Sequence, residues 1–134
     1  MSPFDEDQWE FLFAVAARVA PPVTEFDPER RARFRAIISE ALALRPPAVV
    51  GQIGMFLGVL DRAPALRYGR TFRALDPARQ DAVLRWFQEA PLQKLRQGLW
   101  GVKTLVYMGT YAQTEIAPRL HYAPSFDGNV HLHA

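Results

Sequence analysis

The stretch Gly98–Gln113, "GLWGVKTLVYMGTYAQ", most constrains what this chain can fold into. It has helical length and few breakers, yet its large apolar side chains point to every side of a helix. One of its edges is aromatic and carries Trp100, Tyr107 and Tyr111. A helix that is apolar all round is either the central element of its own domain or is pressed against another molecule.

Two interpretations of this helix stay open from the sequence. In the first, the whole helix is the core of a helical bundle. In the second, only an aliphatic stripe stays in the core, and the Trp100–Tyr107–Tyr111 edge binds a partner, because aromatic anchors are enriched at protein interfaces. The predicted core stripe consists of Leu92, Leu95, Leu99, Val102 and Val106.

Prolines and capping residues predict four further helices before this one. Asp5 is expected to cap the first, with Gln8 as its return partner and Phe4 packed on Trp9. The second and fourth predicted helices begin at "DP" pairs, Asp27-Pro28 and Asp76-Pro77, in which the aspartate caps and the proline takes the first helical position. Pro21-Pro22 and Pro46-Pro47 end helices, and Pro91 opens the last, which is expected to run to Gln113.

The helix predicted at residues 48–61 is rich in apolar residues and glycine. Its expected buried residues are Val49, Ile53, Phe56, Leu57 and Leu60. Gly51, Gly54 and Gly58 do not follow a strand in a phosphate-loop pattern, so we expect them to let another helix approach closely. No stretch alternates like a strand, and the sequence predicts one all-α domain over residues 1–134: a bundle of about five helices with an irregular tail at about 114–134.

Composition excludes several classes of site. The chain has no cysteine, which removes disulfides, thiolate metal sites and cysteine nucleophiles. Residues 1–29 hold seven acidic side chains against one arginine, a distribution that helix capping explains. The basic run "RRARFR" at 30–35 is interpreted as a solvated helix face, and no nucleic-acid partner is predicted. No apolar run reaches the roughly 20 residues of a membrane span, and no signal peptide is recognised, which predicts a cytoplasmic protein.

Catalytic groups are few. The three serines stand outside any nucleophile motif, and the histidines are His121, His131 and His133, all near the C-terminus. His131 and His133 have no third ligand placed near them, so no metal site is predicted. The sequence therefore predicts no catalytic residue, no metal and no cofactor in this chain.

The order of several motifs resembles the gluconate 2-dehydrogenase subunit 3 family, the small subunits of bacterial flavin-dependent dehydrogenases of the glucose–methanol–choline type. The motifs are "VAPP", "FRALDPARQDAVLRWF", the long aromatic helix and "EIAPRLHYAP", and the likeness covers about residues 8–124. They are patterns of apolar residues and prolines. The matching positions are Pro21, Pro22, Phe72, Leu75, Pro77, Leu84, Tyr111, Leu120, Tyr122 and Pro124.

This resemblance implies an accessory role. Such subunits bind a large FAD-carrying subunit, help it mature and often carry a twin-arginine export signal, which would place both in the periplasm. That signal is missing here, and His121 stands where many relatives have glycine. The residues expected to bind the partner are Trp100, Tyr107, Tyr111, Leu120, Tyr122 and Pro124.

A second function class also fits the sequence. A stand-alone helical protein would hold a small apolar ligand, such as a lipid or steroid, between the helix at 48–61 and the last helix. Met55, Phe56, Trp100 and Tyr107 would line that site.

Overall fold

The structure, a computed structural model, describes residues 2–113, and this part of the chain is helical with no strand. The five longer helices are joined by the single turn of α4 and two short 3-10 helices, so the predicted all-α bundle is confirmed. In chain order the elements are α1 (Glu6–Val19), η1 (Pro21–Glu25), α2 (Pro28–Ala43), α3 (Pro47–Arg62), α4 (Ala65–Tyr68), η2 (Phe72–Ala74), α5 (Pro77–Gln88) and α6 (Gln93–Tyr111). The predicted tail lies outside the described residues.

The predicted start of α1 is confirmed. The Gln8 amide donates to Asp5 Oδ1 at 2.7 Å, and the Asp5 amide donates to Gln8 Oε1 at 2.9 Å, which forms a reciprocal capping box. Phe4 packs edge-on against Trp9 with 5.0 Å between ring centroids. The chain therefore enters α1 at a fixed angle with both rings buried.

The two "DP" starts are confirmed as well. Asp27 Oδ1 accepts from the Arg30 amide at 2.8 Å, and Asp76 Oδ1 accepts from the Arg79 amide at 2.9 Å. The last helix differs from its prediction at both ends, since α6 begins at Gln93 and ends at Tyr111. Placing Leu92 in the core stripe was wrong: it precedes the helix and is 64% exposed.

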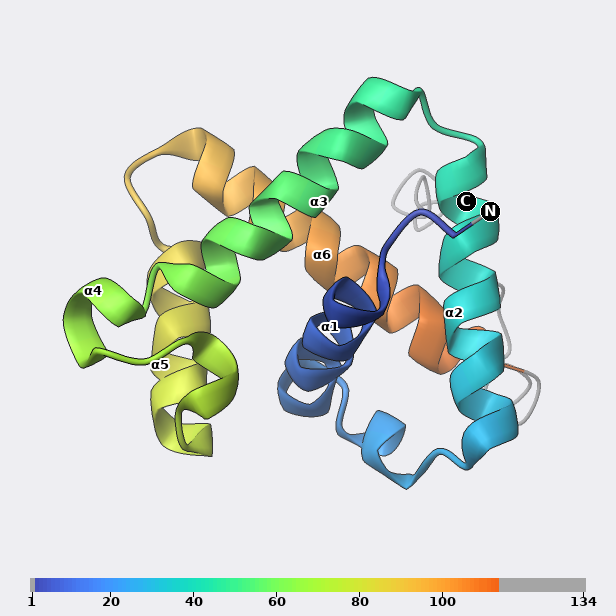
Figure 1. The fold of residues 1–134 in the computed structure, drawn as a ribbon, viewed down its shortest axis with the longest axis horizontal. Helices are drawn as coiled ribbons and strands as arrows, with labels where there is room; N and C mark the ends of the chain where they lie inside the picture. The colour runs from blue at the N-terminus through green and yellow to red at the C-terminus, as the bar shows by residue number, and fades with distance from the viewer. Residues whose placement is uncertain (1, 114–134) are drawn as a thin grey trace, which may run out of the picture.

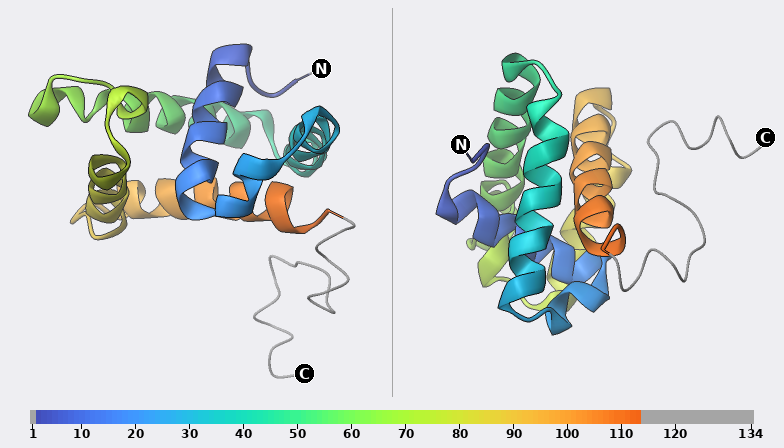
Figure 2. Two further views of the ribbon diagram at one scale, coloured as in Figure 1. Left: turned by 90° about the horizontal axis from the view of Figure 1, so that it is seen from below. Right: turned by 90° about the vertical axis from the view of Figure 1, so that its right-hand side faces the viewer.

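Helix α6 is the centre of the bundle and contacts α1, α2, α3 and α5. It passes behind α1 and α3 in Figure 1, with α5 near its start and α2 near its end. Seen from below, α3 and α6 lie in two layers, and α1 runs steeply across both (Figure 2). Four large side chains of α6 are buried in the core that the helices share: Leu99, Val102, Leu105 and Val106.

Two glycines of α6 let neighbouring rings approach its backbone. A Cβ atom at Gly98 would lie 2.5 Å from Cδ1 of Phe56 in α3, and one at Gly109 would lie 2.7 Å from Cδ2 of Phe34 in α2. Contacts this short leave no room for a methyl group. The close helix approach therefore depends on glycines of α6.

The glycines of α3 do not have the predicted role. A Cβ at Gly51 would meet nothing within 4 Å, and one at Gly58 would meet only Arg62 of the same helix. Gly54 faces another helix, but only the side-chain amide of Gln8. The reason is orientation, because α3 turns just one side to the core.

The buried side of α3 is narrower than predicted. Leu57 and Leu60 are its fully buried apolar residues, whereas Val49, Ile53 and Phe56 are partly buried. The predicted residues Ile53, Phe56, Leu57 and Leu60 therefore do lie on the inward side of α3, but only the last two are fully enclosed.

Charges tie α3 to its neighbours. Arg73 of η2 donates to Asp61 of α3 at 2.9 Å and to both carboxylate oxygens of Asp7 at the start of α1. Hydrogen bonds from Arg73 lower the pKa of Asp7, an effect that desolvation partly opposes. Asp61 is buried, so this cation compensates a carboxylate that would otherwise be costly.

Candidate partner-binding surface

The predicted partner-binding edge lies on the outer side of α6. Trp100 is 67% exposed and Tyr107 is 40% exposed. They are seven residues apart, about two helical turns, and therefore share one side of the helix. Thr104 lies between them, and its hydroxyl donates to the Trp100 carbonyl at 2.8 Å. This aromatic edge of α6 (Trp100, Thr104 and Tyr107) carries no charge.

Tyr111 differs from the other two aromatic residues. It is partly buried and packs against the hydrophobic core, with its ring centroid 6.2 Å from that of Tyr107. Burial, and then the neighbouring Tyr107, raise the pKa of the Tyr111 phenol. Tyr111 thus connects the exposed edge to the core. The core interpretation of the last helix fits its buried side chains and Tyr111, and the exposed edge that the partner interpretation requires is present at Trp100 and Tyr107.

The other three residues predicted to bind a partner, Leu120, Tyr122 and Pro124, lie outside the described residues. All three histidines lie there too. Within residues 2–113, no group of three histidine, aspartate or glutamate side chains is arranged to hold a metal ion.

The predicted apolar ligand site between α3 and α6 is not enclosed. The Phe56 ring fills the space over Gly98 where the two helices meet. Met55 is 73% exposed and Trp100 is 67% exposed, so neither helps to wall a cavity there.

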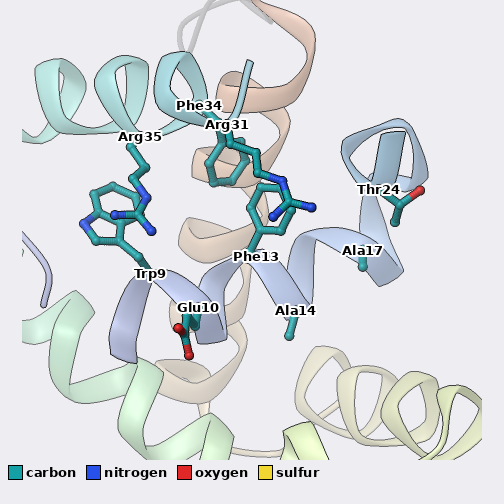
Figure 3. Close-up of a pocket in the computed structure, with 9 residues that line it drawn as sticks. All are labelled: Trp9, Glu10, Phe13, Ala14, Ala17, Thr24, Arg31, Phe34 and Arg35. Carbon is teal, nitrogen blue, oxygen red and sulfur yellow. The ribbon is translucent and has the colours of Figure 1, made fainter. Parts of the chain in front are cut away.

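A cleft between α1 and α2 was not predicted. It has a volume of about 420 Å³, and its aromatic lining comes from Trp9, Phe13 and Phe34. Figure 3 shows the guanidinium of Arg35 near Trp9 and that of Arg31 near Phe13, at 5.5 and 4.8 Å from the ring centroids.

The arginines at this cleft belong to the basic run at 30–35, and most of its side chains have protein partners. Arg35 makes two hydrogen bonds with Glu6, at 2.6 and 3.0 Å, and Arg33 pairs with Glu29 at 2.9 Å. Arg30 lies over the Phe26 ring, as Arg31 lies over Phe13. The run is therefore part of the packing between α1 and α2 rather than only a solvated face.

A second cleft, of about 490 Å³, lies between the end of α3, α4 and α5. Leu66 and Trp86 line it and are 94% and 56% exposed. Val83 and Phe87 form its buried wall. Its lining residues come from two separate stretches, residues 63–68 and α5, so no single stretch of the sequence indicates this cleft.

The stretch Pro47–Tyr68 also bears on the prediction of no membrane span. By length and composition this helical stretch is apolar enough to cross a membrane, and 17% of its most apolar window is buried. Such a feature is weak grounds for a span, since core helices of soluble proteins share it.

Comparison with known proteins adds no relative. No protein-family model, curated protein or solved structure matches this chain. The resemblance to the small dehydrogenase subunits therefore stays a prediction from the sequence.

Proposed function

We propose that this protein is a non-catalytic helical subunit that binds a larger protein through the aromatic edge of α6. The observation that carries the proposal is the exposure of Trp100 and Tyr107 on a helix whose other sides form the core. Exposed aromatics are preferred anchors at the centres of interfaces.

The rigid position of this edge favours binding. Leu99 and Val102 fix α6 in the core on the side opposite Trp100. A partner would bury a surface that is already ordered, so little conformational entropy is lost on association. Because the edge is uncharged, its desolvation also costs less than that of a charged surface.

The class of partner comes from the sequence resemblance. We propose an FAD-dependent oxidoreductase of the glucose–methanol–choline type, with the FAD held by that partner.

The test is capture of the partner by the full-length chain, affinity-tagged and expressed in its native host. The proposal expects a captured protein that carries FAD, identified by its flavin absorption. The double variant Trp100→Ser/Tyr107→Ser should weaken binding by about thirtyfold or more, as truncation of central aromatic anchors does. Its melting temperature should change little, because both side chains are exposed.

Trp86→Ser is the matched control, since Trp86 is an exposed tryptophan on α5 rather than α6. This variant should keep the partner. Capture of a protein without flavin would contradict the assigned partner, and equal capture by the double variant would contradict the assigned surface.

A further inference from the structure

The outer side of α3 is an exposed apolar row. Residues spaced by three and four positions share one side of a helix. On α3 and into α4 this row comprises Ala48, Gln52, Met55, Val59, Arg62 and Leu66. Met55 is 73% exposed, Val59 43% and Leu66 94%, so the row faces outward along its whole length.

Such a composition is unusual for the solvent side of a helix. The outer side of a surface helix is normally charged or polar. Here no charged residue occurs from Pro46 to Leu60, and 17% of the most apolar window of this stretch is buried. A core helix would be mostly buried, so packing among residues 2–113 does not account for the apolar row.

The row continues into the cleft at α4 and α5. Leu66 ends the row and also lines that cleft, together with Trp86 and Phe87. The exposed apolar surface therefore extends from α3 to the indole of Trp86, a side chain that favours the boundary between apolar and aqueous surroundings.

Positive charge surrounds this surface. Residues 41–75 contain five arginines and a single acidic residue, Asp61. Asp61 is buried and bound by Arg73, which also binds the exposed Asp7 of α1. Four arginines remain exposed at this part of the molecule: Arg45, Arg62, Arg67 and Arg70.

We propose that the outer row of α3, with Leu66 and Trp86, binds the surface of an anionic phospholipid bilayer. The apolar side chains enter the boundary between headgroups and acyl chains, and the arginines bind lipid phosphates and acidic headgroups. An exposed apolar side with cationic flanks is the pattern of a helix that lies in the membrane interface.

In this arrangement α3 lies on the bilayer and does not cross it. α3 alone has 16 residues and is about 24 Å long at 1.5 Å per residue, shorter than the hydrocarbon core of about 30 Å, and the stretch reaches the 22 residues of a possible span only together with α4. Leu57 and Leu60 also hold its inner side in the protein core. Crossing the bilayer would require the bundle to open.

Charge complementarity favours lipid over a second copy of this chain. A symmetric dimer through this surface would bring its arginines near those of its partner, and like charges oppose association. An anionic bilayer offers an apolar interior for the row on α3 and negative charge for the arginines around it.

The test is flotation of the full-length chain with large unilamellar vesicles. Binding is expected with phosphatidylcholine vesicles that contain phosphatidylglycerol, and only weakly with phosphatidylcholine alone. The variant Met55→Glu/Val59→Glu should abolish flotation. Arg62→Gln/Arg67→Gln should lower the partition constant by about thirtyfold, because each basic residue contributes about a factor of five near an anionic surface.

Two variants on other surfaces are the controls. Trp100→Ser removes an exposed aromatic residue of α6, and Arg31→Gln removes an arginine of α2 that stacks on Phe13. Both should float like the original chain. Thermal melting of every variant shows whether a loss of lipid binding comes from a loss of folding. The milder variant Met55→Gln/Val59→Thr serves the same purpose.

Absence of flotation with the anionic vesicles would overturn the proposal. So would flotation that the α3 variants leave unchanged in folded protein. A concentration-dependent dimer that Met55→Glu/Val59→Glu abolishes, without vesicle binding, would overturn it in favour of a second copy as the occupant.

Discussion

Helices α3 and α6 have similar length and composition but different surroundings. Each contains three glycines and is apolar on more than one side. Four helices pack around α6, whereas α3 contacts the rest of the fold along one side and leaves Met55 and Val59 in solvent. Both also expose large apolar side chains, which are aromatic on α6 (Trp100 and Tyr107) and aliphatic on α3 (Met55 and Val59).

The difference shows that apolar periodicity does not identify the core by itself. In α6 the glycines at 98 and 109 receive rings from Phe56 and Phe34, so the helix is enclosed. In α3 no neighbouring side chain occupies the space beside Gly51, because this glycine faces open space. The same residue type is a packing requirement in one helix and a source of instability in the other.

The largest expected effect is loss of a buried side chain from α6. Leu99 is 1% exposed, and Leu99→Ala should lower the free energy of unfolding by about 3 kcal/mol through lost burial and a residual cavity. Met55→Ala on α3 should change it by less than about 0.5 kcal/mol. Urea denaturation of both variants measures their free energies of unfolding. Equal losses of unfolding free energy would mean that Met55 of α3 is enclosed as Leu99 is.

A smaller effect, of opposite sign in the two helices, is expected when glycine is replaced by alanine. Gly109→Ala should destabilise by about 2 kcal/mol, because the added methyl group overlaps the buried Phe34 ring. Gly51→Ala should stabilise by up to about 1 kcal/mol, because it removes backbone freedom without a clash. Thermal melting distinguishes them; stabilisation by both would show that the Phe34 ring moves aside easily.

The smallest effect concerns the charges that hold α3. The pKa of Asp7 is lowered by Arg73, so their interaction stabilises the fold fully above the ordinary aspartate pKa of about 3.9. This contribution is lost as the pH falls through the lower pKa of the folded state. Asp7→Asn should therefore reduce stability at neutral pH, and the difference from the original chain should shrink as the pH falls below the lowered pKa of the folded state, where the carboxyl is protonated in both folded and unfolded states.

Melting curves of both proteins across that range measure the difference. A difference in stability between the two proteins that stays constant at all pH values would show that Asp7 acts through packing or capping rather than through its charge.

Local features of this fold were predictable, and features that depend on distant neighbours were not. The caps at Asp5, Asp27 and Asp76 involve residues three positions apart, so the sequence contains all that is needed to infer them. The contact of Phe56 with Gly98 joins separate helices, and nothing local distinguishes Gly98 from Gly51.

The candidate partner-binding surface on α6 was also predictable only in its local features. The spacing of Trp100 and Tyr107 placed them on one edge, and the structure leaves both exposed. The pattern put Tyr111 on the same edge, but its partial burial depends on how the end of α6 packs against the core. The outer row of α3 was missed because Gly51, Gly54 and Gly58 were attributed to the close approach of another helix.

The central position of α6 has a consequence for synthesis of the chain. Its residues, 93–111, leave the ribosome after the helices that surround them. Until then α1, α2, α3 and α5 have no common helix to cover their apolar sides, and domains generally fold as units when their chain is complete. Since ribosomes add about 5–20 residues per second, the nascent chain exposes this unfinished core for seconds. Chaperones therefore have their longest access to this protein just before α6 appears.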